Sequence, residues 1–161
     1  MYKSKTSPIA ILGQLDNGSL INRDAYPLAS TNLGDIVAVR VESSLFFANC
    51  ERVANFIEME MSRLQAIGIR TRGVVLDAQF MNDMDATTIQ VLSDMQEKFA
   101  VRHITFAIAG ASAKLHDMLG QTNLLKRIFA GTPSHPVEDV VRMLHSLSAP
   151  PTGARAGTNL V

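Results

Sequence analysis

Two carboxylates and a hydroxyl occupy one short stretch near the middle of the chain. Asp77 ends an apolar run, Asp85 follows it eight residues later, and Thr87 lies just beyond. If a strand ends at Asp77 and a helix begins at Asp85, the Thr87 hydroxyl lies in the first helical turn, at the positive end of the helix dipole. A phosphate added there would be stabilised, and the two carboxylates could hold a cation or orient the hydroxyl. The spacing predicts a regulatory site made of Thr87, Asp77 and Asp85.

A simpler interpretation of the same stretch stays open. Asp85 is a good N-cap residue, and in that case Thr88 faces the protein core and the stretch only starts a helix.

Four other residues of this stretch could form a contact surface. Phe80, Met81 and Met84 are apolar, and Asp83 adds a negative charge beside them. A loop that joins a strand to a helix lies at the rim of a sheet, where a partner can reach it. We expect this partner-contact rim (Phe80, Met81, Asp83 and Met84) to be an interaction surface whether or not Thr87 is modified.

The sequence shows no convergent signals of a catalytic centre. Its four histidines are scattered, and no pair has the spacing of metal ligands. The motifs GxSxG, GxxxxGK[ST] and GxGxxG are absent. The single cysteine, Cys50, excludes an internal disulfide and a cysteine-built zinc site. We therefore expect no enzyme activity, no metal and no cofactor; nucleotide binding stays open.

Composition and charge exclude several classes of protein. Fifteen basic residues balance fifteen acidic ones, so the chain carries no overall basic field for nucleic acid. Hydrophobic residues make up 47 % of the chain, which is typical of a globular domain and excludes general disorder. No apolar stretch is long enough to cross a membrane.

The elements that position this stretch alternate between strands and helices. Apolar and β-branched runs predict strands at 9–12, 20–22, 36–41, 73–77 and 104–109. Apolar residues at helical spacing predict helices at 50–67, 85–99, 112–119 and 134–147, with a brief apolar segment at 124–129. Such alternation predicts a mostly parallel sheet with helices packed on it.

One domain accounts for most of the chain. We place it at residues 7–147, and predict a disordered tail at 148–161, where prolines and glycines replace apolar residues. Residues 43–49 are expected to form a turn, in which Phe46 and Phe47 pack under the edge of the sheet.

The segment VVLDAQFMNDMDATTIQVL resembles the signature of STAS domains, the family shared by sulfate transporters and anti-sigma-factor antagonists. The family pattern is a strand ending in Asp, a short loop, and Asp-Ser-[Ser/Thr]-Gly at the start of a helix. Asp77 and Asp85 match the two acids, and Thr87 falls where antagonists carry a phosphorylated serine. Ala86 and Thr88 depart from the Ser and Gly that are usual in the family.

Two upstream segments are similar to the STAS domain of SulP-type anion transporters. They are SPIAILGQLDNGSLINRDAYPLAS and GDIVAVRVESSLFFANCERV. The resemblance covers roughly residues 7–147. It implies an α/β class, the STAS fold, with a small central mixed β-sheet flanked by about four to five α-helices.

The resemblance also implies a function. It indicates a regulatory or interaction domain, without catalysis, of a SulP-type secondary anion transporter for sulfate-like or bicarbonate-like substrates, on the cytoplasmic side of the cell (inner) membrane. The implied partners are the transporter's own transmembrane domain, a second copy of the transporter and a cytoplasmic regulatory protein, with no nucleic acid. The alternative is a stand-alone anti-sigma-factor antagonist that is switched by phosphorylation at Thr87.

Overall fold

Five strands form one sheet in the order β2-β1-β3-β4-β5. The computed structural model describes residues 9–25, 33–42, 46–81, 86–129 and 133–148. The strands are β1 (Ile9–Gln14), β2 (Leu20–Asn22), β3 (Ile36–Val41), β4 (Gly73–Asp77) and β5 (Thr105–Ala109). The helices are α1 (Phe46–Ala66), α2 (Ala86–Val101), α3 (Ala113–Gly120), α4 (Leu124–Arg127) and α5 (Val137–Ser148), and a 3-10 turn, η2 (Arg23–Ala25), follows β2.

The sheet is mixed, as predicted. Strands β3, β4 and β5 run parallel, whereas β1 is antiparallel to both of its neighbours, β2 and β3. The parallel register places Arg40 of β3 beside Asp77 of β4, and Asp77 beside Ala109 of β5. The carboxyl ends of these three parallel strands therefore lie together at one end of the sheet. We call this end of the sheet the carboxyl edge and the opposite end the amino edge.

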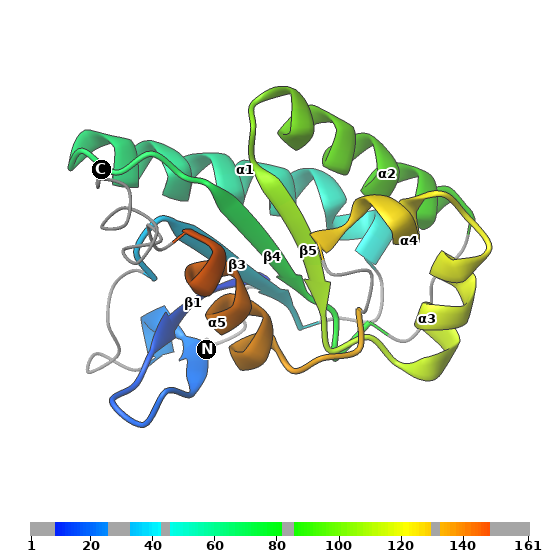
Figure 1. The fold of residues 1–161 in the computed structure, drawn as a ribbon, viewed down its shortest axis with the longest axis horizontal. Coiled ribbons are helices and arrows are strands. Elements are labelled where there is room, and N and C mark those ends of the chain that lie inside the picture. The colour runs from blue at the N-terminus through cyan, green and yellow to red at the C-terminus, as the bar shows by residue number, and fades with distance from the viewer. Residues whose placement is uncertain (1–8, 26–32, 43–45, 82–85, 130–132, 149–161) are drawn as a thin grey trace, which may run out of the picture.

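Helices cover both faces of the sheet. In Figure 1, α1 and α2 lie on one side of the strands and α5 lies on the other. Alternate residues of β3 follow this division, because Val37, Val39 and Val41 belong to the apolar cluster under α1 and α2, whereas Ile36 and Ala38 belong to the cluster under α5. Arg40 shares the α5 side, where it follows Ala38 at the carboxyl edge.

The predicted buried stripes of the two long helices are confirmed. Their members are Val53, Ile57, Met61 and Leu64 on α1, and Thr88, Leu92, Met95 and Phe99 on α2, all buried. Helical spacing brings the residues of each stripe to one face, and the apolar ones join the larger core cluster.

The predicted turn at residues 43–49 is wrong in part. Helix α1 begins at Phe46, four residues before the expected start at Cys50. No glycine or proline interrupts residues 46–50, so nothing in the local sequence stops the helix from extending. The side chains of Phe46 and Phe47 lie outside the described residues, and so does the tail from residue 149 onward; both predictions stay predictions.

Candidate functional site

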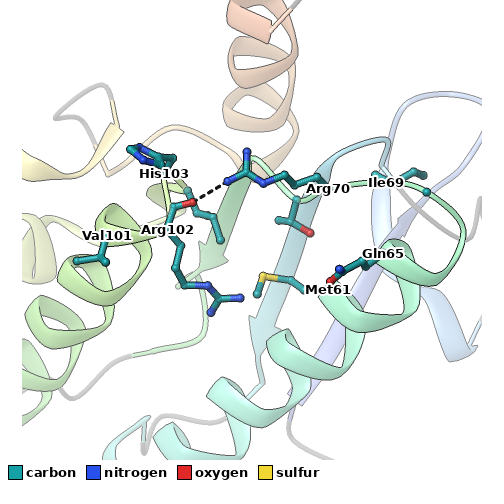
Figure 2. A pocket seen from close by; sticks show the side chains of 10 residues that line it. Met61, Gln65, Ile69, Arg70, Val101, Arg102 and His103 are labelled. Carbon is teal, nitrogen blue, oxygen red and sulfur yellow. Dashed lines mark hydrogen bonds between the residues drawn. The ribbon is translucent and has the colours of Figure 1, made fainter.

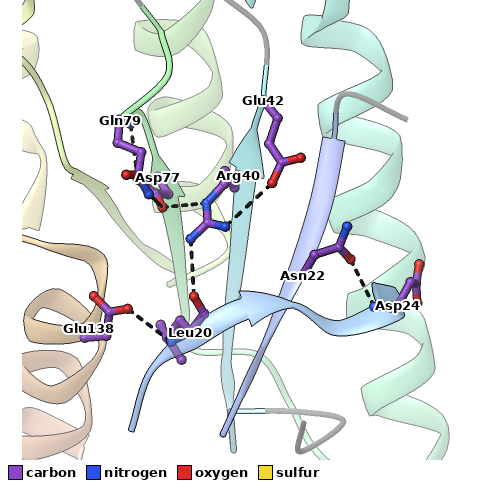
Figure 3. A network of polar contacts seen from close by, with 8 residues as sticks. All are labelled: Leu20, Asn22, Asp24, Arg40, Glu42, Asp77, Gln79 and Glu138. Atoms are coloured by element: carbon purple, nitrogen blue, oxygen red, sulfur yellow. Dashed lines mark hydrogen bonds and ion pairs between the residues drawn. The ribbon is translucent and has the colours of Figure 1, made fainter. Parts of the chain in front are cut away.

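Asp77 lies at the carboxyl edge and is almost fully buried, with 1 % of its surface exposed. Three hydrogen bonds hold its carboxylate (Figure 3). Arg40 Nε donates to Oδ2 at 3.0 Å, Gln79 Nε2 donates to the same oxygen at 3.0 Å, and the Gln79 main-chain N–H donates to Oδ1 at 3.2 Å. A buried carboxylate needs such partners, and Asp77 has a charged one and two neutral ones. Its role in the structure is to clamp the start of the loop that follows β4.

Arg40 extends this clamp to two other elements. Its Nη2 donates to the Leu20 carbonyl of β2 at 3.3 Å, and its Nη1 lies 3.6 Å from a carboxylate oxygen of Glu42. The Phe80 ring centroid lies 5.9 Å from the guanidinium carbon, within the range of a cation–π contact. We call Arg40, Asp77 and Gln79 the buried clamp, after the buried carboxylate of Asp77 at its centre; Gln79 itself is exposed.

Leu20 is held from a second side. A carboxylate oxygen of Glu138, in the first turn of α5, accepts a hydrogen bond from the Leu20 N–H at 3.0 Å (Figure 3). The Leu20 N–H therefore bonds to α5, and the Leu20 carbonyl bonds to Arg40 of the buried clamp. Three separate parts of the chain, β2, α5 and the loop after β4, are tied together at this edge.

Gly110 provides the space for the clamp. A Cβ at this position would lie 2.8 Å from Asp77 Oδ1 and 3.1 Å from the Gln79 Cβ. The residue also has φ +68°, a conformation that side chains disfavour. Its N–H donates to the His135 carbonyl at 2.7 Å, which joins the end of β5 to the segment before α5.

Part of the predicted site faces solvent. Phe80 is 45 % exposed, and Thr87, the second residue of α2, is exposed as well. Thr88 is buried, as the simpler interpretation of this stretch predicts. The two predicted site residues on either side of the loop thus differ. The Asp77 carboxylate is buried and hydrogen-bonded within the protein, whereas Thr87 is accessible to solvent.

The prediction that Met81 belongs to the contact surface is wrong. Its side chain is 1 % exposed and joins the core cluster under α1 and α2. The reason is a tight turn, in which the Met81 N–H donates to the Ala78 carbonyl at 3.0 Å and the chain returns toward the core. Asp83, Met84 and Asp85 lie outside the described residues.

The sequence analysis left open that Asp77 and Asp85 could hold a cation; the Asp77 oxygens already accept three hydrogen bonds, and Asp85 lies outside the described residues. Within the described residues, no group of three or more His, Cys, Asp or Glu side chains could hold a metal ion. Arg40 is the site residue that the sequence analysis missed. An arginine inside the otherwise apolar run IVAVRV was the available signal, since a charge in a buried strand requires a partner.

Comparison with known proteins agrees with this architecture. The family model for the STAS domain matches residues 28–141. Sulfate transporter 1.2 of Arabidopsis thaliana is 28 % identical over 130 residues, which cover 71 % of this chain and 20 % of that protein. Sulfate transporter 4.1, chloroplastic, from the same plant is 24 % identical over 135 residues, which cover 80 % of this chain and 20 % of the transporter. The chain thus spans about a fifth of the length of these curated relatives.

A solved structure shows the same fold. The murine Solute Carrier 26 family member A9 anion transporter, in its inward-facing state, superimposes with a TM-score of 0.68 over 88 % of this chain and 22 % of that chain, at 17 % sequence identity. In the part of this chain that the structure describes, no helix has the length and hydrophobicity needed to cross a membrane. The family model covers more than half of the chain and the mixed α/β fold matches, so the chain belongs to the STAS domain family.

Proposed function

We propose that this chain is the cytoplasmic regulatory or interaction domain of a SulP-type anion transporter, with no catalysis of its own. The observation that carries the proposal is the pattern of coverage: two proteins named sulfate transporters match 71 % and 80 % of this chain but only 20 % of their own length. A domain of that size within a transporter is suited to regulation or to contacts between parts of the assembly.

The geometry of the carboxyl edge fits an interaction role. The buried clamp fixes the start of the loop after β4, and Phe80 is the next residue after the clamp's Gln79. An exposed aromatic side chain on a fixed backbone can bind a partner without a large loss of conformational entropy. The partner in this proposal is the transporter's own transmembrane domain or a second copy of the transporter.

The clamp also offers a route by which contact could change the domain. A partner that moves Phe80 acts directly on Arg40, and through Arg40 on Asp77 and on β2, which is bonded to α5. Such coupling needs only a preference of the partner for one arrangement of the clamp.

The full-length protein tests the proposal. It is expressed with and without residues 9–148 in cells that lack their own sulfate uptake, and entry of labelled sulfate is measured at equal amounts in the membrane. We expect uptake to change when the domain is removed. Identical uptake at every sulfate concentration would contradict a regulatory role.

The alternative function is a stand-alone antagonist switched at Thr87, and one observation favours it: Thr87 is exposed in the first turn of α2. Phosphate there would gain from the helix dipole and from unpaired N–H groups. The test is incubation of the chain with cell extract and ATP, followed by mass spectrometry, with Thr87→Ala as the control. Stoichiometric phosphate at Thr87 that switches binding of a kinase partner would favour the antagonist; no phosphate in any extract would count against it.

A further inference from the structure

A cavity of about 600 Å³ opens at the amino edge, between the C-terminal ends of α1 and α2 (Figure 2). Ten residues line it, and three of them are basic, namely Arg70, Arg102 and His103, whereas none is acidic. Figure 2 shows both arginine side chains at this hollow, with Met61 and Gln65 of α1 across from Arg102. The cavity is thus separate from the carboxyl edge and has a cationic lining.

Thr71 supplies an unpaired hydrogen-bonding group. Its side chain lines the cavity and is 94 % buried, since only 6 % is exposed. Within the described residues, its Oγ1 is buried without a hydrogen-bond partner. Buried hydroxyls almost always have a partner, because an unpaired one is costly. A hydroxyl without a partner at the wall of a cavity is the kind of group that a bound oxygen atom would satisfy.

His103 keeps its side chain at a position that favours glycine. Both long helices end in the same way: Gly68 after α1 and His103 after α2 adopt positive φ, at +86° and +60°. In each case the following N–H bonds back into the last helical turn, from Ile69 to Leu64 and from Ile104 to Phe99. Glycine is the usual residue at such a helix end, whereas here the position places an imidazole beside the cavity.

Neither arginine is locked inside the protein. Arg70 is exposed, and its Nη2 donates to the Arg102 carbonyl at 3.2 Å. Arg102 pairs with Glu58 at 2.6 Å, but both side chains are about half exposed, at 46 % and 52 %. Exposed ion pairs contribute little to stability and exchange partners readily. An anion bound in the cavity can therefore replace Glu58 as the ion-pair partner of Arg102.

Two helix C-termini at this edge carry partial negative charge, which opposes an anion. The main chain offsets part of that charge, since N–H groups of the following residues bond the last-turn carbonyls of Leu64, Gln65, Phe99 and Ala100. The lining adds the positive charges of Arg70 and Arg102 and the imidazole of His103, and the acid that pairs with Arg102, Glu58, is not part of the lining.

We propose that this cavity binds a tetrahedral oxyanion, the chemistry shared by free sulfate or phosphate and by the phosphate group of a lipid. Arg70 and Arg102 supply charge-assisted hydrogen bonds, Thr71 donates its hydroxyl, and His103 stands at the mouth as a further donor. The proposal does not depend on the transporter function.

Titration of the 161-residue chain with inorganic phosphate and with sulfate, followed by amide NMR, tests the proposal. We expect saturable shifts at residues 68–71 and 102–104, and affinity about tenfold lower in Arg70→Gln and in Arg102→Gln. The matched control is Arg127→Gln, because Arg127 pairs with Glu97 at 3.0 Å outside this cavity. An equal loss of affinity in Arg127→Gln would overturn the proposal.

Three further variants separate binding from folding. Thr71→Val and His103→Gly should weaken anion binding while the midpoint of urea unfolding stays the same or rises, because each removes a local cost to the fold. Glu58→Gln should tighten binding, since it releases Arg102. Tighter or unchanged binding in both Thr71→Val and His103→Gly would overturn the roles assigned to these side chains.

The source of the oxyanion is distinguished by a second titration, with phosphatidylglycerol vesicles against phosphatidylcholine vesicles. Saturation by inorganic phosphate or sulfate supports a free anion, and Arg70-dependent binding to phosphatidylglycerol alone supports a lipid head group. No binding to any of these probes would overturn the proposal, and so would equal binding to both vesicles without a saturable response to the free anions.

Discussion

The two edges of the sheet each carry an arginine–carboxylate pair, and the two pairs differ strongly in burial. At the carboxyl edge, Arg40 and Asp77 lie 3.0 Å apart with 12 % and 1 % of their side chains exposed. At the amino edge, Arg102 and Glu58 lie 2.6 Å apart with 46 % and 52 % exposed. The shorter pair is the more exposed one, so distance alone is a poor guide to what an ion pair contributes.

The difference in burial separates a fixed edge from an exchangeable one. Arg40 and Asp77 are largely shielded from water, so the loss of either one leaves the other as a charge inside the protein without its main partner. The protein loses little stability when the Arg102–Glu58 ion pair at the amino edge opens. Within the described residues, the Thr71 hydroxyl at this edge is buried without a hydrogen-bond partner. The first arrangement is suited to holding a surface in place and the second to taking up a ligand.

The largest expected effect is the loss of Asp77. The substitution Asp77→Ala removes the charge partner of a largely buried arginine, and we expect the free energy of unfolding to fall by about 3–5 kcal/mol. The matched change at the other edge, Glu58→Ala, should cost less than about 1 kcal/mol. Urea unfolding of both variants measures the two costs. Equal costs would break the distinction between the edges.

The next largest loss of stability is expected when each of two glycines is replaced by alanine. Gly110 and Gly68 both have positive φ, but a Cβ at Gly110 would meet Asp77, whereas a Cβ at Gly68 has nothing within 4 Å. We expect Gly68→Ala to lose about 1–2 kcal/mol from backbone strain alone. Gly110→Ala should lose about 3 kcal/mol, because the clash with the clamp adds to the same strain. Thermal unfolding of both variants separates the two contributions; a larger loss at Gly68 would contradict the clamp's tight packing.

The smallest effect concerns Glu60 of α1, a carboxylate that is buried while its arginine partners are partly exposed. Burial raises the pKa of Glu60, but the hydrogen bonds and charges of Arg63 and Arg23 outweigh it, and the pKa lies below its usual value of 4.5. A carboxyl whose pKa is lowered by folding stabilises the protein above its unfolded pKa. That contribution disappears as the pH falls through the folded value.

The substitution Glu60→Gln tests this dependence. Near pH 7 the variant should unfold at lower urea than the parent, and the gap between the two midpoints should narrow as the pH is lowered below 4.5. Urea titrations at both pH values measure the convergence. A constant gap between the midpoints at both pH values would show that the cost of the substitution comes from packing instead.

Local patterns were sufficient to predict much of the fold. Val53, Ile57, Met61 and Leu64 recur at helical spacing, and burial of that one face follows from the geometry of a helix. The burial of Thr88 followed in the same way, because Thr88 shares one helical face with Leu92, Met95 and Phe99. Where a helix or strand repeats regularly, the sequence pattern and the burial agree.

The errors and omissions share a different cause. Met81 is apolar and lies in a loop, and only the turn from Ala78 decides that it points inward. Arg40 meets Asp77 because β3 and β4 are adjacent and in register, a pairing between residues 37 positions apart that no local pattern contains. Neither follows from a regular repeat, because the first depends on the geometry of one turn and the second on strand pairing, and both residues lie at the candidate site.

Uptake by the full-length protein is the most direct test of the claim that the carboxyl edge is the interaction surface. Phe80→Asp changes an exposed aromatic residue at that edge, and Met59→Asp changes an exposed residue of α1, 69 % exposed, that lies outside both sites. With equal expression and folded domains, we predict that Phe80→Asp lowers labelled sulfate uptake severalfold while Met59→Asp leaves it at the parent rate. Normal uptake in Phe80→Asp, or an equal loss in Met59→Asp, would contradict the account.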